Sequence, residues 1–152
     1  MNPIRKAIAR FRSGDLKWAQ SALAFRPFDT FHDTNRVAFP IPVEGGYADG
    51  MVSTDPNDPR ATHVCAVGSI CRVVDVSQME QLDLDTRECL DLAALEAGVE
   101  PDGEEPTLGF LMTTLNDGLN PLEYAKSYER ILEVMERAAD LLDERREWRE
   151  VA

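Results

Sequence analysis

The sequence predicts a mainly α fold. We expect one compact domain over residues 1–152, with about five to six helices and a small β-hairpin or irregular insert at about residues 26–61. Three observations favour this class. Apolar residues recur three and four positions apart, helix-start and helix-stop residues bracket those segments, and prolines and glycines gather in the insert. At 152 residues, the chain is long enough to bury a core without disulfides or metal ions.

The longest mostly apolar run is Thr62–Val74, and it predicts the central helix. Val64, Val67, Gly68 and Cys71 fall on one helical face, and further apolar residues form a second row. A helix that is apolar on most sides is buried. Glycine costs roughly 1 kcal/mol relative to alanine inside a helix, and the close approach of another helix would account for Gly68.

The other helices follow from capping residues and spacing. Asn2-Pro3 begins the first helix, and Asn120-Pro121 begins the last. The expected helices lie at about 3–13, 16–25, 62–74, 85–97, 107–115 and 121–148. The insert holds five prolines and three glycines. Within it, Arg36–Ile41 and Tyr47–Val52 can pair as a short hairpin, with Pro40 confined to an edge strand.

Composition excludes several functions. The formal net charge is −12 with a pI near 4.5, which argues against direct binding to nucleic acid. No apolar run reaches the roughly 20 residues of a membrane span, and the basic N-terminus lacks the apolar core of a signal peptide. Three cysteines without a disulfide framework favour a reducing environment. We therefore expect a cytoplasmic protein.

Two interpretations of Cys65 compete. A free cysteine is often a small buried apolar side chain. Alternatively, a cysteine in the first turn of a helix, with Arg72 on the same stripe, would have a stabilised thiolate. A nucleophile also needs a base, and the chain offers only His32 and His63. The second interpretation makes the protein a cysteine-dependent hydrolase or transferase.

The sequence predicts no metal site and no cofactor. His63, Cys65, Cys71 and Cys89 resemble a zinc set in composition, but helical geometry points them in different directions. Phosphate-binding glycine loops and the common hydrolase and metalloprotease motifs are absent from the sequence.

Acidic residues gather in the middle of the chain. Residues 81–106 carry nine acidic and one basic side chain, a net charge of −8. The candidate binding residues of this face are Asp83, Asp85, Glu88, Asp91, Glu104 and Glu105. Such a face can be simple solvated surface, can dock on a basic protein, or can mimic a nucleic-acid backbone. The polar end of the last helix, with Trp148, is a candidate homodimer contact.

Three short motifs resemble a family of small uncharacterised proteins of actinobacteria, other bacteria and their phages. The motifs are Trp18-Ala-Gln-Ser-Ala, Cys65-Ala-Val-Gly-Ser-Ile and Leu115-Asn-Asp. The family shows a W-x-Q-G-A-like element, an F-C-A-L-G-A-L helix and a W-N-D turn. This chain departs from that pattern at Ser21, Val64 and Leu115. The resemblance implies a helical layout and no assigned activity, and it marks Cys65, Gly68, Asn116 and Asp117 as positions of interest. Asn116 and Asp117 are candidate binding residues, or alternatively they only end a helix before the next cap.

These observations favour a non-enzymatic function. We expect a small acidic protein of bacterial or phage origin that acts by binding another protein. The cysteine-dependent enzyme and the nucleic-acid mimic are the alternatives.

Overall fold

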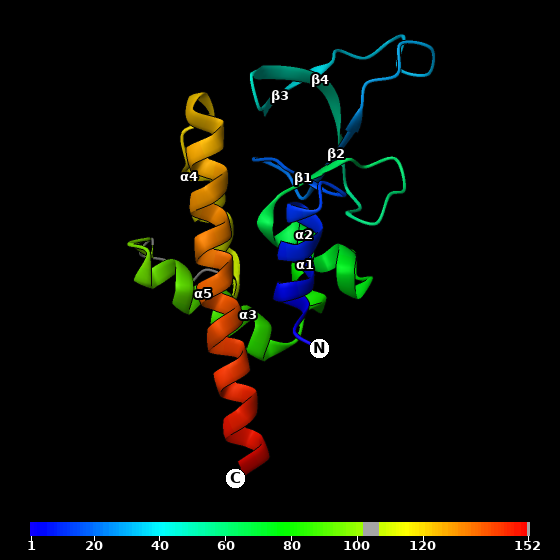
Figure 1. Ribbon diagram of the computed structural model, residues 1–152. Coiled ribbons are helices and arrows are strands. Elements are labelled where there is room, and N and C mark those ends of the chain that lie inside the picture. Colours follow the sequence, from blue (N-terminus) through cyan, green and yellow to red (C-terminus); the bar gives the residue numbers. More distant parts are fainter. Residues whose placement is uncertain (102–106, 152) are drawn as a thin grey trace.

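The computed structural model describes residues 1–101 and 107–151. Within these ranges the chain forms five α-helices, two short 3-10 helices and one five-stranded sheet (Figure 1). The helices are α1 (Pro3–Arg12), α2 (Ala66–Val74), α3 (Leu84–Glu96), α4 (Phe110–Gly118) and α5 (Tyr124–Val151), with η1 (Met79–Gln81) and η2 (Pro121–Glu123). The strands are β1 (Lys17–Trp18), β2 (Ala24–Pro27), β3 (Phe39–Val43), β4 (Gly46–Ser53) and β5 (His63–Val64).

The expectation of a mainly α domain with a small insert at 26–61 is wrong, because the fold is mixed. The hairpin β3–β4 exists, but it belongs to a sheet that also recruits strands on both sides of the insert. The predicted helix at 16–25 is replaced by β1 and β2. Its apolar spacing suited a helix, yet Ser21 has φ +76°, which a right-handed helix cannot contain. Pairing with distant strands decided the conformation of this segment.

The sheet is mixed and its strand order is β1-β5-β2-β4-β3. Strands β1 and β5 are parallel, with Lys17 opposite His63, and the other neighbours are antiparallel. Both edges are poor templates for an added strand. Strand β1 has two residues, and β3 carries Pro40 and Pro42, which have no N–H to offer.

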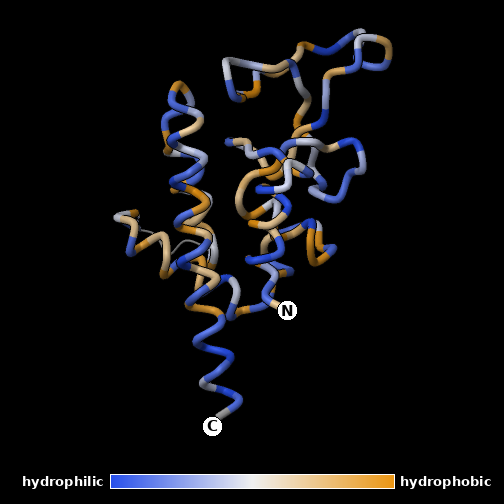
Figure 2. Tube along the Cα trace, in the orientation of Figure 1, coloured by the Kyte–Doolittle hydropathy of each residue, from blue (hydrophilic) through white to orange (hydrophobic). Residues whose placement is uncertain are grey.

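The main core lies where the five α-helices meet the short strands. Its largest fully buried side chains include Trp18, Ile70, Met112 and Met135. A smaller cluster of Ala19, Phe25 and Ile41 lies under the hairpin. Helix α5 runs the length of the molecule, and the hairpin lies beside its upper end (Figure 1). The last turns of α5 extend below the body and are mostly hydrophilic (Figure 2).

Helix α2 begins later than the apolar pattern predicts, because His63 and Val64 form a strand and Cys65 is the N-cap. Gly68 is required there, but not by a neighbouring helix as expected. A Cβ at Gly68 would lie 2.0 Å from the carbonyl oxygen of Leu23, in the chain that leads into β2. The contact is with backbone, which cannot move aside as a flexible side chain can.

We predict that Gly68→Ala lowers the free energy of unfolding by about 2 kcal/mol or more, because the added methyl group overpacks α2 against Leu23. Urea denaturation measures the change. Gly118→Ala is the matched control in α4, since nothing lies within 4 Å of its added Cβ. The control should keep or slightly raise stability. Equal stability of the two variants would contradict the close approach.

Candidate functional site

The side chain of Asn116 joins three distant parts of the chain. Its Oδ1 accepts hydrogen bonds from the indole Nε1 of Trp18 at 2.7 Å and from the backbone N–H of Ala66 at 3.1 Å. Its Nδ2 donates to the carbonyl of Ala19 at 3.1 Å. Asn116 is fully buried. One amide group therefore ties the end of α4 to β1 and to the first turn of α2.

Neighbouring residues complete this network. Gln20 Nε2 donates to the carbonyls of Asn116 and Leu119, both at 2.8 Å. The backbone N–H of Ser21 donates to Asp117 Oδ1 at 2.8 Å. Ser21 adopts a positive φ that glycine prefers. The side chains of Asn116 and Asp117, expected as binding residues, are thus engaged within the chain.

The same network positions an aromatic stack. The hydroxyl of Tyr124 donates to the carbonyl of Trp18 at 2.7 Å. The ring centroids of Trp18 and Tyr124 are 5.4 Å apart, and those of Tyr124 and Tyr128 are 6.2 Å apart. Trp18 is buried, whereas the two tyrosines are half-buried. The first turn of α5 therefore presents stacked tyrosine rings toward the hairpin.

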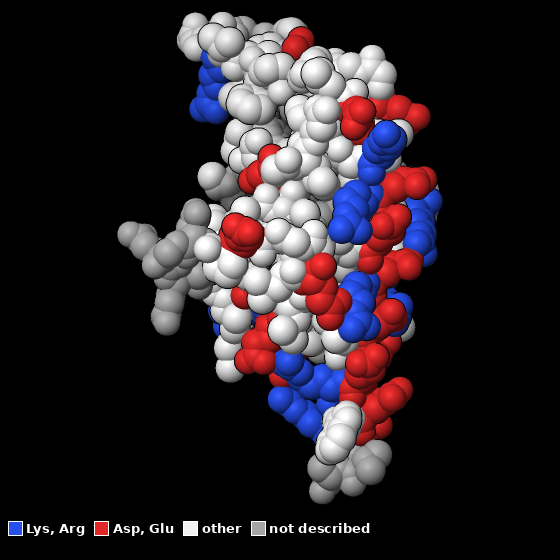
Figure 3. Space-filling model, turned by 90° about the vertical axis from the view of Figure 1, so that its left-hand side faces the viewer, with Lys and Arg blue, Asp and Glu red and all other residues white. Residues whose placement is uncertain are grey.

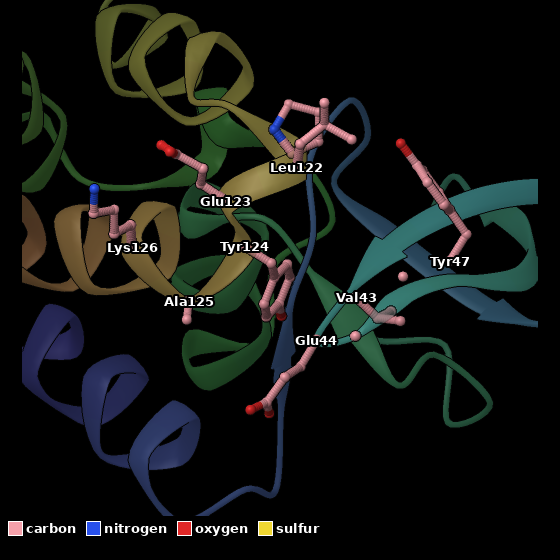
Figure 4. Close-up of a pocket in the computed structure, with 11 residues that line it drawn as sticks. Val43, Glu44, Tyr47, Leu122, Glu123, Tyr124, Ala125 and Lys126 are labelled. Carbon is pink, nitrogen blue, oxygen red and sulfur yellow. The ribbon is translucent and has the colours of Figure 1, made fainter.

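Two cavities flank Tyr124 and form one groove between the hairpin and the helices. The inner cavity has a volume of about 470 Å³ and the outer one about 530 Å³. Both are lined by Val43, Glu44 and Tyr124, so they adjoin one another. In the outer cavity, Tyr47 of β4 and Leu122 of η2 lie on the two sides, while Glu44 extends past Tyr124 (Figure 4). The inner cavity reaches Lys17, His63 and Tyr128.

Burial changes the acid–base properties of the groove. It lowers the pKa of His63, with a smaller contribution from the nearby charge of Lys17, so the imidazole is neutral at pH 7. Burial also raises the pKa of Tyr124 to about 12. Within the described residues, the charged groups of Lys17 and Glu44 form no ion pair or hydrogen bond. These groups are free to contact a ligand.

The structure does not assemble the predicted cysteine site. Cys65 is buried at the N-cap of α2, and its Sγ accepts a hydrogen bond from the N–H of Gly68 at 3.2 Å. Burial raises the pKa of this thiol to about 12, which leaves it protonated at neutral pH. His63 faces the groove, with Nδ1 2.8 Å from the hydroxyl of Thr62.

The other two candidates of that site hold loops in place. Arg72 donates from Nη1 to the carbonyls of Pro56, Asp58 and Ala61, which fixes the segment before β5. His32 lies exposed in the loop before β3, with Nδ1 2.5 Å from a carboxylate oxygen of Asp29. Neither contacts Cys65.

The acidic candidates of the 81–106 segment serve mostly structural roles. Asp83 caps α3, and buried Asp91 accepts hydrogen bonds from the N–H groups of Gly109 and Leu111 at the start of α4. Asp85 pairs with Arg145 and Arg149 of α5, and Glu88 pairs with Arg145. Glu104 and Glu105 lie outside the described residues. The pairing with α5 neutralises part of the charge that this face would present.

Neither a metal cluster nor a membrane span is found in the described part of the chain. No three or more His, Cys, Asp or Glu side chains converge there as metal ligands. No helix in the same ranges combines the length and the hydropathy needed to cross a membrane.

Sequence reasoning missed the groove. Tyr124 and Tyr128 are spaced i, i+4 within an otherwise aliphatic seam, and Gly45-Gly46 marks a tight turn opposite them. This tyrosine pair was the one indication in the sequence that the start of the apolar face of the last helix differs from the rest of that face. The pattern that predicts a helix over residues 16–25 does not place Lys17 beside the groove, because it misses the pairing of β1 with β5.

We predict that Asn116→Ala lowers the free energy of unfolding by about 2–4 kcal/mol, because the change leaves buried donors on Trp18 and Ala66 without a partner. Urea denaturation measures the loss. Asn35→Ala, in an exposed loop, is the control and should stay within about 0.5 kcal/mol of the wild type. A loss at Asn116 no larger than at Asn35 would show that the network is dispensable.

We also predict that the native thiols resist alkylation. Burial raises the pKa of Cys65 and of Cys71 to about 12, and both are protonated across the neutral range. The rate of iodoacetamide modification at Cys65, measured by mass spectrometry from pH 6 to 10, should stay low and rise only in urea. Cys65→Ser serves as the control for peptide assignment. Rapid native modification with an apparent pKa well below the reference of about 8.5 would restore the nucleophile hypothesis.

The chain matches no protein-family model, no curated protein and no solved structure. The function of this chain is therefore argued from the geometry of its candidate site.

Proposed function

We propose that the protein acts without catalysis, by binding a partner protein in the groove between the β3–β4 hairpin and the start of α5. The observation that carries this proposal is that the outer cavity is lined by apolar side chains that are exposed to solvent. Leu122 is 79% exposed and Tyr47 58% exposed, on opposite sides of an opening of about 530 Å³. Exposed apolar side chains that gather at a concave surface are typical of interaction sites.

Several exposed apolar residues lie at this end of the molecule, and others lie on helices α2 to α5. The strands, the preceding loop and η2 contribute Phe31, Val37, Phe39, Tyr47, Val52 and Leu122. On the face that Figure 3 shows, charged side chains form a band along one side of the molecule. A partner that docks here would bury apolar surface, which is the main favourable term in most protein association.

The mode of contact is through side chains rather than strand addition. Pro40 and Pro42 interrupt the donors of the β3 edge, and β1 is too short to template a further strand. A segment held in the groove would therefore be recognised by the aromatic and aliphatic lining.

Origin and location remain parts of the same proposal. The proposal includes a bacterial or phage origin, because three short motifs resemble the bacterial and phage family. A bacterial or phage protein with three unpaired cysteines fits the cytoplasm. A homodimer through the C-terminal helix is a secondary proposal, supported only by the 78% exposure of Trp148.

The alternatives have less support. A cysteine-dependent enzyme needs an accessible thiolate, whereas Cys65 is buried and protonated. A nucleic-acid mimic needs a continuous uncompensated acidic face, whereas Asp85 and Glu88 are paired with arginines of α5.

We predict that Leu122→Glu abolishes capture of the partner by the tagged protein from bacterial lysate, because a carboxylate at the mouth of the groove opposes apolar burial. Leu84→Glu is the matched control, since Leu84 is 60% exposed on α3, outside the groove. Quantitative mass spectrometry should identify proteins retained by the wild type and Leu84→Glu but lost from Leu122→Glu. An identical set from all three baits would contradict the proposed site.

A further inference from the structure

We infer that the inner cavity binds the C-terminal residue of the partner, with its carboxylate at Lys17 and His63 and its apolar side chain on the tyrosine rings. This inference rests on the proposed function, because the rest of the partner segment would lie in the outer cavity. It adds the chemistry that the groove recognises: an apolar residue with a free α-carboxylate.

The size and lining of the inner cavity suit one amino-acid residue with a neighbouring peptide group. Its volume of about 470 Å³ lies within the roughly 300–1,000 Å³ of ligand sites. Phe11, Leu16 and Trp18 form a fully buried base. Tyr124 and Tyr128 stack at an interplanar angle of 23° and stay half-buried. Part of the surface of both rings is open to an apolar side chain, because both tyrosines line the cavity.

Two donors lie at the β1–β5 side of the cavity. Lys17 and His63 are register partners in the parallel strand pair, and both line the cavity. His63 Nδ1 lies 2.8 Å from the hydroxyl of Thr62. When Nδ1 accepts from that hydroxyl, the proton of the neutral ring is on Nε2, which becomes a donor. A carboxylate can accept from Nε2 and pair with the Lys17 ammonium, which has no carboxylate partner among the described residues.

Glu44 gives the bound segment a direction. It belongs to the hairpin turn and lines both cavities, so a chain that passes from one to the other runs beside its carboxylate. A peptide N–H is a donor that Glu44 can accept. With the carboxylate at Lys17, the preceding residue then lies between Tyr47 and Leu122 in the outer cavity (Figure 4).

The test uses the purified protein in a Trp148→Phe background, which leaves Trp18 as the single tryptophan. Trp18 packs against Tyr124 and Tyr128, so its fluorescence reports on the cavity. The probes are the peptide acetyl-Gly-Ser-Leu-Leu-Phe as free acid, the same peptide as C-terminal amide, and N-acetyl-phenylalanine. We expect saturable binding of the acid and at least about tenfold weaker binding of the amide, because the amide loses a charge-assisted contact.

Variants separate specific recognition from general apolar binding. Lys17→Ala should weaken the acid to the level of the amide and leave the amide unchanged. Lys6→Ala, an exposed lysine of α1 outside the cavity, should leave both unchanged. Equal affinities of acid and amide would overturn the inference. If N-acetyl-phenylalanine binds as tightly as the peptide, the rest of the peptide contributes nothing to binding. That result would contradict the inference that the carboxylate belongs to a segment of a partner protein.

Failure of this inference is distinguishable from failure of the proposed function. The proposed function fails when Leu122→Glu captures the same proteins as the wild type. Carboxylate recognition fails when acid and amide bind alike to the purified protein, whatever the lysate experiment shows.

Discussion

The architecture depends on the buried amide of Asn116. Its oxygen accepts from the Trp18 indole and from the first N–H of α2, and its nitrogen donates to the carbonyl of Ala19. A buried polar group in this position must find all of its partners, because each one left unsatisfied costs about 1–3 kcal/mol. The three chain segments that meet here lie about 50 residues apart in the sequence, so the network joins separate elements of the fold rather than stabilising one of them.

The network has a direct consequence for the surface. Trp18, held by Asn116, accepts a hydrogen bond through its carbonyl from Tyr124. This bond orients the first turn of α5 and its tyrosine pair. Opposite them, β3 and β4 reverse direction at Gly45 and Gly46, both with positive φ, which brings Glu44 to the edge of the stack. The groove thus lies between the hairpin turn and the hydrogen-bonded start of α5.

The sequence predicted the parts that rely on local chemistry. Asn2 caps α1 through its side chain as expected, and the spacing of apolar residues in α5 places its buried face. The sequence did not predict the sheet, because strands β1 and β5 contain two residues each. Two residues are too few to show the alternation of apolar and polar side chains that marks a strand. Trp18 and Val64 become neighbours only through long-range pairing.

The candidate site was missed for the same physical reason. Asn116 and Asp117 look in sequence like the end of a helix, and the same residues satisfy donors of Trp18 and Ser21 far away in the chain. The nucleophile interpretation of Cys65 requires an accessible helix terminus, whereas packing buries the sulfur as the alternative interpretation expects. Burial decides the role of Cys65, and long-range hydrogen bonds decide the role of Asn116 and Asp117. Neither produces a residue pattern that can be recognised within one segment of the sequence.

The most direct test of the groove as the binding site is the location of amide shift changes in 1H–15N correlation spectra, recorded while the free-acid peptide is titrated into the protein. The account predicts the largest changes at Lys17, Glu44, His63 and Tyr124, together with the side-chain Nε1–H of Trp18. Changes confined to the loop around His32 or to α3, with the groove amides unmoved, would contradict it.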